Sequence, residues 1–428
     1  MALIEVTGFF SSETSKKVTV VKKYWLGFDL AYRNITRHKR RSIIAVGAVG
    51  FGVIAFILAS GFIEYIFWGL REATIESQLG HIQISRPGYQ ESGKADPFSF
   101  LLSDTPPELE AVTEPHQIKA IAPRLSFSGL ISHEEATLSF IGDGIDPRAQ
   151  SAFGDSLQIV AGQNLSPADS KAIIMGAGLA QNLGVNIDDQ VVLLAKTASG
   201  GINGVEVSIR GLFSTVTKAY DDSALRIPIS TARQLLRTQG THTWIMLLND
   251  TAQTDTVLAG LRNKFGKDFE IVPWYDLADF YNKTVVLFSK QVQGMRLIIA
   301  FIILLSISNT MTMSIIERTG EIGTSLALGV KRSIVMRLFL TEGIVLGCLG
   351  GAFGLTVGLL LASLISSIGV PMPPPPGMAR GYMGEIRVTW DIALESLILA
   401  IGTTLAASLY PAWKASRMQI VDALRHNR

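Results

Sequence analysis

The sequence is poor in both cysteine and charge. Cys348 is the single cysteine among 428 residues, so an intramolecular disulfide is impossible and a cysteine-based metal site is not expected. Charged residues make up 17% of the chain and hydrophobic residues 48%, with a mean hydropathy of +0.32. This composition is apolar for a soluble protein of such length and indicates an integral membrane protein.

Motifs for nucleotide, metal and acyl-transfer chemistry are also missing. The phosphate-binding sequence Gly-x-x-x-x-Gly-Lys-Ser/Thr does not occur. His81, His116, His133 and His242 are scattered without the His-x-x-x-His spacing of a zinc site, and there is no Gly-x-Ser-x-Gly nucleophile elbow. We therefore expect a non-catalytic chain that binds no metal and no cofactor of its own.

Long apolar stretches are what the sequence has in abundance. Residues 43–63, 297–316 and 343–370 carry no charge, and each stretch reaches the roughly 20 apolar residues that cross a bilayer core. A fourth span is expected near the C-terminus. The predicted organisation is a cytoplasmic N-terminal segment (1–42), a first span (43–70), an extracytoplasmic domain (71–283), a stalk and second span (284–316), a cytoplasmic coupling segment (317–332), a third span (333–370), an outer proline-rich loop (371–391), a fourth span (392–413) and a cytoplasmic tail (414–428).

The distribution of basic residues orients these spans. Cations are dense before the first span, between the second and third, and after the fourth, whereas the loop after the third span has only Arg380 and Arg387. Positive charge marks the cytoplasmic side, so both termini are predicted to be cytoplasmic. The basic run at 22–41 is interpreted as topogenic charge, with binding to anionic membrane lipids as the alternative and no nucleic acid partner.

Residues 71–283 have the pattern of a soluble α/β domain, and they could form two subdomains. Alternating strands are predicted at 81–84, 125–131, 137–141, 205–212 and 244–248, and short helices at 178–183, 231–237 and 251–265. The fold class is thus membrane α-helical, with four transmembrane helices and a large extracytoplasmic α/β domain between the first and second spans.

The third span contains a ladder of glycines that is suited to close helix packing. Without side chains, such positions let two helix backbones approach each other in lipid. The ladder could pack against helices of the same chain or against a second subunit, and both alternatives stay open at this stage. Its members are Gly347, Gly350, Gly351, Gly354 and Gly358.

The segment between the second and third spans carries the charges that could meet a cytoplasmic motor. Glu317 and Glu321 are four residues apart and share a face of any helix there, and Gly329 is a plausible C-cap. A helix at 319–328 would turn charge to the cytoplasm and rest Ile322, Leu326 and Leu328 on the membrane side. The alternative is a simple connector. The residues predicted to couple to an ATPase are Glu317, Arg318, Glu321, Ile322 and Gly323.

Three stretches resemble the FtsX-like or MacB-type family of ABC transporter permeases. They are Glu-Arg-Thr-x-Glu-Ile-Gly-x-x-x-Ala-Leu-Gly at 317–329, the closing segment from Pro411 to Arg425, and Ile-Ile-Met-Gly-x-x-Leu-Ala-x-x-Leu-Gly-Val at 173–185. The four-span plan matches as well. Asp188-Asp189 and Met418 depart from the family pattern, and the region around Gly80 to Tyr89 is closer to the lipoprotein-releasing branch than to the drug-export branch.

This resemblance implies a permease subunit of the cell inner membrane that works with a separate ATPase, which would bind ATP and Mg. It also implies a second permease copy, in a homodimer or heterodimer, and allows a periplasmic partner protein. The expected function is extraction or export of a lipoprotein, lipid or other amphiphile. The alternative is a cargo-free signalling subunit that activates a periplasmic hydrolase or sensor.

Overall fold

A computed structural model describes residues 39–93, 95–103, 117–150, 157–373 and 381–420. Most of the predicted N-terminal segment, the prolines at 374–376 and the end of the predicted tail lie outside the described residues. The chain divides into two compact units. The membrane unit contains the described residues up to Tyr65 together with 287–370 and 384–420, and the outer domain contains 66–286 and 371–383.

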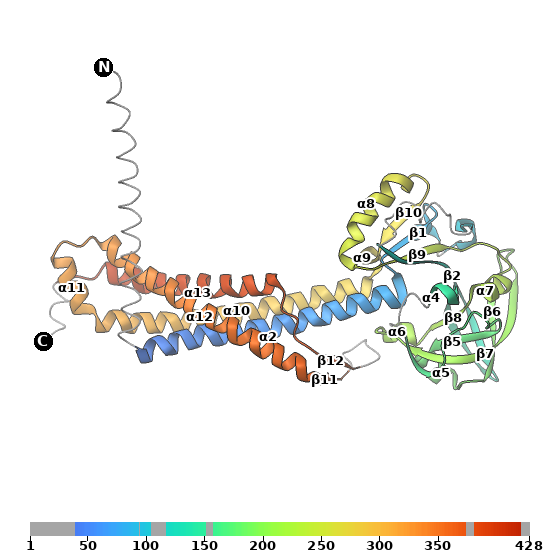
Figure 1. The fold of residues 1–428 in the computed structure, drawn as a ribbon, viewed down its shortest axis with the longest axis horizontal. Helices are drawn as coiled ribbons and strands as arrows, with labels where there is room; N and C mark the ends of the chain where they lie inside the picture. Colours follow the sequence, from blue (N-terminus) through green and yellow to red (C-terminus); the bar gives the residue numbers. More distant parts are fainter. Residues whose placement is uncertain (1–38, 94, 104–116, 151–156, 374–380, 421–428) are drawn as a thin grey trace, which may run out of the picture. The chain divides into compact units, whose positions relative to one another are not determined.

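Four described helices are long and apolar enough to cross a membrane, which confirms the predicted number of spans. They are α2 (Lys39–Thr74), α10 (Asp279–Glu317), α12 (Arg332–Ile368) and α13 (Trp390–Ser416), drawn in blue, yellow and two shades of orange to red (Figure 1). A short helix, α11 (Thr319–Ala327), lies between α10 and α12 in sequence. Two short strands, β11 (Val370–Met372) and β12 (Tyr382–Gly384), pair with each other between α12 and α13.

The core of the membrane unit is built from all four long helices. Its buried side chains include Val53 and Phe56 of α2, Ile303 of α10, Leu346 of α12 and Ala400 of α13. Serine and threonine hydroxyls in the spans donate to carbonyls one turn earlier, as Thr310 does to Ser306. Backbone polarity is satisfied inside each helix, as a bilayer requires.

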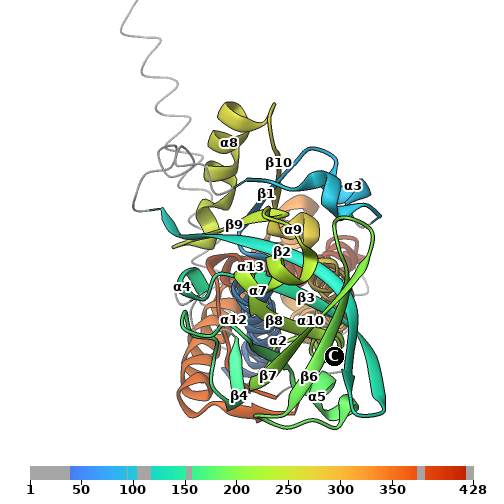
Figure 2. The ribbon, with the colours of Figure 1, turned by 90° about the vertical axis from the view of Figure 1, so that its right-hand side faces the viewer.

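The outer domain contains a ten-stranded sheet in the order β10-β1-β9-β2-β3-β8-β5-β7-β4, with β6 pairing β2 and β7 (Figure 2). Its strands are β1 (Ile82–Ser85), β2 (Ile118–His133), β3 (Ala136–Ile145), β4 (Gln158–Gly162), β5 (Ala172–Gly176), β6 (Gln190–Lys196), β7 (Ile202–Ser214), β8 (Ala224–Pro228), β9 (Thr243–Leu248) and β10 (Glu270–Pro273). Its remaining helices are η1 (Ile75–Leu79), α3 (Tyr89–Ser92), η2 (Pro97–Phe100), α4 (Pro147–Gln150), α5 (Ala177–Leu183), α6 (Lys218–Asp221), α7 (Ile229–Leu236), η4 (Thr251–Gln253), α8 (Thr254–Phe265) and α9 (Trp274–Leu277).

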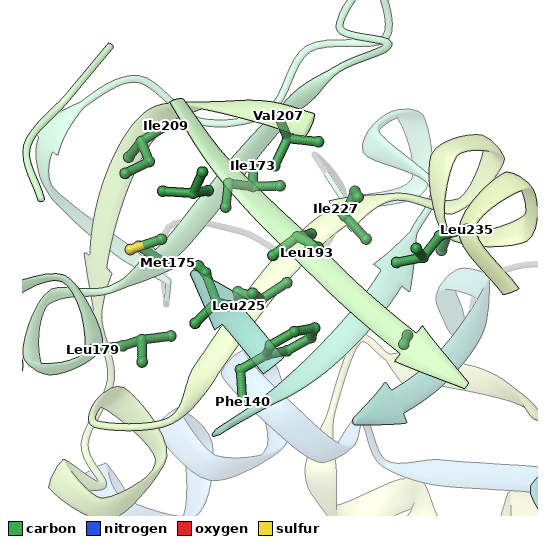
Figure 3. Packing of buried hydrophobic residues seen from close by; sticks show 14 of the residues in the cluster. Phe140, Ile173, Met175, Leu179, Leu193, Val207, Ile209, Leu225, Ile227 and Leu235 are labelled. Atoms are coloured by element: carbon green, nitrogen blue, oxygen red, sulfur yellow. The ribbon is translucent and has the colours of Figure 1, made fainter. Parts of the chain in front are cut away.

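Six of these strands pair in a closed circuit, β2-β3-β8-β5-β7-β6 and back to β2. The circuit encloses the largest apolar cluster, in which Phe140, Ile173, Leu193 and Leu225 point toward one another (Figure 3). Closure removes most free strand edges, so this part of the domain presents few templates for unwanted strand pairing.

A second core forms where β9, β1 and β10 extend the sheet beyond the circuit. Successive residues of β9 face opposite sides, as a strand dictates. Trp244 and Met246 pack with helix α8 on one side, whereas Ile245 and Leu247 pack with η1 and α9 on the other. The two stretches that border the spans in sequence, η1 and α9, therefore share one apolar cluster inside the outer domain.

The structure corrects several predicted elements. The strands predicted at 125–131 and 137–141 are the inner parts of the longer hairpin β2–β3. The predicted helix at 251–265 begins with a 3₁₀ turn and becomes α-helical at Thr254, because the Asp250 side chain accepts a hydrogen bond from the Ala252 amide and caps the turn. Strands β4, β5, β6, β8 and β10 of this sheet are not among the predicted strands.

Candidate coupling site

The turn from the second span into α11 is set by one non-helical residue. Helix α10 ends at Glu317, and Arg318 has φ −104° and ψ 13°, after which α11 runs from Thr319 to Ala327. The Ile322 amide donates to the Arg318 carbonyl oxygen at 2.9 Å, which starts the new helix. The direction of α11 is therefore decided at Arg318.

The far end of α11 closes in a Schellman motif. The Val330 amide donates to the Ser325 carbonyl oxygen and the Gly329 amide to that of Leu326, both at 3.1 Å. Gly329 has a φ of 92°, a conformation that L side chains rarely adopt. The helix stop predicted at Gly329 lies at this turn, although the C-cap residue itself is Leu328 and Gly329 follows it at the C′ position. The segment is a defined helix with a defined stop.

One face of α11 is buried in the membrane unit. Ile322 and Leu326 join an apolar cluster with Val335 and Phe339 of α12 and Ala412 of α13. The prediction that Leu328 lies on the same face is wrong, since this residue is 81% exposed. It lies beyond the last helical turn and therefore no longer follows the helical period. Gly323 is buried within α11.

The predicted charged residues have different surroundings. The Glu317 carboxylate is held by Arg41 of α2, with Nη1 to Oε2 at 2.8 Å and Nη2 to Oε1 at 3.3 Å. The Glu321 side chain is 61% exposed and lies 3.5 Å from Arg318 Nε. The two acids predicted to serve together are thus divided: Glu317 pairs with Arg41 of another helix, whereas Glu321 pairs with the neighbouring Arg318 and is mostly exposed.

Two residues of this site were not identified from the sequence. Arg41 was counted among the topogenic cations, and its partner Glu317 is 276 positions away. Glu342 is a buried acid in α12, and its Oε2 lies 3.6 Å from Arg318 Nη1. A lone acid beside an apolar stretch was the available signal, since ionisable residues in spans tend to be functional.

The glycine ladder of α12 packs inside the chain on two faces. A Cβ atom at Gly350 or Gly354 would lie 2.6 Å from Val49 Cβ or Val53 Cβ of α2. A Cβ atom at Gly351 would lie 3.2 Å from Leu397 Cδ2 of α13. Gly347 faces Thr404 of α13, and Gly358 faces Ile57 of α2. Of the two alternatives, the described contacts supply partners for all five glycines within one subunit.

Two family models match the chain. The FtsX-like permease C-terminal model matches residues 295–420, and the MacB-like periplasmic core domain model matches residues 42–264. The first contains α11 with most of α10 and all of α12 and α13. The second contains the closed strand circuit and most of α2.

Curated relatives agree with these matches. The chain is 24% identical over 292 residues to an uncharacterized ABC transporter permease of Methanocaldococcus jannaschii, covering 66% of this chain and 69% of that one. It is 21% identical over 322 residues to the lipoprotein-releasing system transmembrane protein LolE of Haemophilus influenzae, covering 72% and 77%. It is 25% identical over 252 residues to the macrolide export ATP-binding/permease protein MacB of Syntrophobacter fumaroxidans, covering 54% of this chain and 32% of that one.

The four spans, the outer α/β domain inserted after the first span and both family matches describe one architecture. The match to the core domain alone extends over more than half of the sequence, from residue 42 to residue 264. This chain belongs to the FtsX-like and MacB-like family of ABC transporter permeases.

Proposed function

We propose that this permease converts ATP hydrolysis by a separate cytoplasmic ATPase into movement of its outer domain, and that the motor contacts α11. ATP and Mg would be held by the ATPase, and this chain would bind neither. The observation that carries the proposal is the two-sided construction of α11. Its apolar side is packed on α12 and α13, while Glu321 and Leu328 project from it with 61% and 81% of their surfaces exposed.

This construction suits a part that transmits force. A simple connector between two spans needs no buried face and no fixed stop, whereas α11 has both. Beside it lies a groove of about 150 Å³ that is lined by Glu321, Ser325, Val330, Ile334 and Leu338, among others. An exposed carboxylate next to an apolar groove fits a partner that presents a cation beside apolar side chains.

The orientation follows from this proposal and from the charge bias. The motor side must be cytoplasmic, so α11 and both termini would face the cytoplasm and the outer domain would face the opposite side of the inner membrane. In a Cys348→Ala background, Ala327→Cys should resist an impermeant thiol reagent added outside intact cells, and Ser199→Cys should react. Both positions are exposed in the described structure. The reverse pattern would overturn the orientation.

The proposed cargo is an amphiphile such as a lipoprotein or lipid. The support is the pair of named relatives, one a lipoprotein-releasing protein and one a macrolide exporter, since both names refer to cargo with apolar parts. We also propose that a second permease copy completes the assembly. Apolar side chains such as Leu297, Ile298 and Phe301 of α10 are mostly exposed, and such surface is suited to lipid or another subunit.

The experiment that tests the motor contact is charge reversal at Glu321. The ATPase that copurifies with the tagged permease is identified by mass spectrometry, and its binding and ATP turnover are then measured in nanodiscs. Glu321→Lys should reduce both by about tenfold or more, because reversing a charge beside a partner cation costs at least about 1.4 kcal/mol. The matched control is Glu135→Lys, an exposed acid in a turn of the outer domain.

Full ATPase binding and full turnover in Glu321→Lys would show that α11 is only a connector. Loss of binding in both variants would instead point to a general effect of added positive charge, and would count against a specific contact at α11.

A further inference from the structure

Glu317 and Arg318, the two residues immediately before α11, form ion pairs with two different helices. Glu317 is bound by Arg41 of α2, and Arg318 faces Glu342 of α12. One dipeptide thus joins the second span to both the first and the third. Arg318 Nε also lies 3.5 Å from Glu321 Oε2, so this mostly exposed acid is a third carboxylate at the edge of the group.

Burial is deepest on the side of the third span. Glu342 and Arg318 have side chains that are 9% and 15% exposed, compared with 22% and 49% for Arg41 and Glu317. Arg41 and Glu342 also line one cavity of about 20 Å³, together with Ser314 and Leu346, so both arginines lie near the same buried acid. The two ion pairs are therefore parts of one cluster.

The position of this cluster matters because Arg318 is the residue at which the chain bends. Its backbone is non-helical between two helices, so α11 can change direction there without unwinding either helix. A rotation of α11 about Arg318 must move its guanidinium relative to Glu342. Charges in poorly hydrated surroundings are costly to separate, so the pairs oppose such a rotation.

We propose that Arg41, Glu317, Arg318 and Glu342 form a positioning cluster that fixes the direction of α11 and carries its displacement directly to the first and third spans. Without the cluster, a push on α11 would reach α10 through the backbone and α12 only through apolar contacts, which slide more easily than paired charges. The inference depends on the proposed function for the origin of the push, but the fixing of α11 does not require a motor.

The test measures the direction of α11 in the full-length permease, in nanodiscs and without any ATPase. Spin labels are placed at Ala327→Cys on α11 and Leu409→Cys on α13 in a Cys348→Ala background, and both positions are exposed. The unmodified cluster should give one narrow distance distribution. Arg318→Gln and Glu342→Gln should each broaden it, and the double variant should be no broader than the worse single variant, because the two residues act as a pair.

A matched control is available in the same unit. Arg296 of α10 and Glu395 of α13 form another ion pair between helices, at 3.5 Å, with side chains that are 38% and 50% exposed. Arg296→Gln removes a pair of similar length that does not touch α11, so it should leave the distribution narrow. Arg318→Lys keeps the charge and should restore much of the order that Arg318→Gln loses.

Should Glu342→Gln fail to accumulate in the membrane, Glu317→Gln tests the same cluster at its more exposed pair. Narrow distributions in Arg318→Gln and Glu317→Gln would overturn the proposal, as would equal broadening in Arg296→Gln. These outcomes are separate from motor binding, because the distance distributions are measured without any ATPase.

Discussion

Two buried arginines of the outer domain and two arginines of the membrane unit have different kinds of partner. In the outer domain, Arg226 is fully buried and its Nη2 donates to the Ser77 carbonyl oxygen, while Arg124 Nη1 donates to that of Gln78. Both acceptors belong to η1, the last helical turn that follows α2. In the membrane unit, Arg41 and Arg318 face carboxylates instead.

The two kinds of partner, backbone carbonyl and carboxylate, differ in how readily an arginine can lose them. A helix end leaves carbonyl oxygens without partners, and a guanidinium that binds them supplies donors that no pH change removes. Near these arginines, Asp143 accepts hydrogen bonds from Ser126 Oγ at 2.7 Å and Tyr220 OH at 3.3 Å. A side-chain ion pair can be broken and remade as helices move, whereas a backbone carbonyl moves only with its helix. The two outer arginines thus hold the backbone of η1 itself, whereas the ion pairs of the membrane unit act between side chains and resist a turn of α11.

The largest effect should come from removing the hydrogen bond between Arg226 and the Ser77 carbonyl oxygen. Arg226→Met keeps the length of the side chain but leaves the Ser77 carbonyl oxygen without its donor and Asp143 with Arg124 as a remaining cation, which should destabilise the outer domain by about 3 kcal/mol. Thermal unfolding and hydrogen exchange at 75–79 in the full-length protein measure this loss. The control is Arg86→Met, an exposed arginine of the same domain. Equal stability of the two variants would contradict the assignment.

A smaller effect on stability is expected from disturbing the close packing of α2 against α12 in the membrane unit. In Gly354→Leu, the new Cβ atom would lie 2.6 Å from Val53 Cβ and 2.7 Å from the Gly50 carbonyl oxygen, so α2 and α12 must separate. Overpacking of this kind costs about 1–3 kcal/mol. Gly402→Leu on α13 is the control, since a Cβ atom there meets nothing within 4 Å among the described residues. Thermal stability in detergent should fall only in Gly354→Leu.

If instead Gly402→Leu alone disturbed the assembly, the open face of α13 would have to contact another subunit. The comparison of these two glycines therefore separates packing within the chain from packing between copies.

The smallest effect is a pH dependence confined to the outer domain. Burial lowers the pKa of His81 to about 4, below its ordinary value of 6.5. Its Nδ1 accepts a hydrogen bond from the Leu248 amide at 3.1 Å, and its Nε2 lies 3.0 Å from Thr251 Oγ1, which donates to Glu72. The folded state therefore favours the neutral ring, and the unfolded chain binds more protons between pH 6.5 and about 4.

Stability from His81 is thus complete above pH 6.5 and is lost as the pH falls, by about 1 kcal/mol between pH 6.5 and about pH 5.5. Denaturant unfolding of the full-length protein at several pH values measures this slope. Burial also lowers the pKa of His242 to about 4, so His81→Gln should reduce the slope and leave the part due to His242, whereas His133→Gln, in the β2–β3 hairpin, should leave it unchanged. A slope that is unchanged in His81→Gln would contradict the role of this histidine.

The sequence predicted the parts of the fold that depend on local pattern. The four spans follow from uncharged stretches longer than a bilayer is thick, and α11 follows from Glu321, Gly329 and the spacing of Ile322 and Leu326. Strands β8 and β9 are buried along their whole length, so neither shows the alternation of a half-buried strand. Strand β9 was still predicted, at 244–248, whereas β8 was not. Closure of the strand circuit depends on β2 pairing with β6 at 129–132, beyond the part of the same strand that pairs with β9, and no local signal contains this pairing.

The sequence predicts the segment that forms the candidate site but not the ion pairs that its residues make. Glu317 and Glu321 were grouped because they share a helical face, yet the chain bends at Arg318 between them and gives them different neighbours. Arg41 and Glu342 come from other helices, and only the tertiary structure brings them to this bend.

The hydrogen bonds from Arg226 and Arg124 to η1 restrict insertions and deletions in this part of the chain. Each residue added to or removed from an α-helix turns everything beyond it by about 100°. An insertion or deletion between Arg71 and Ser77 would swing the carbonyl oxygens of Ser77 and Gln78 away from Arg226 and Arg124. The length of this segment is therefore constrained, so homologues of different sequence should align here without gaps.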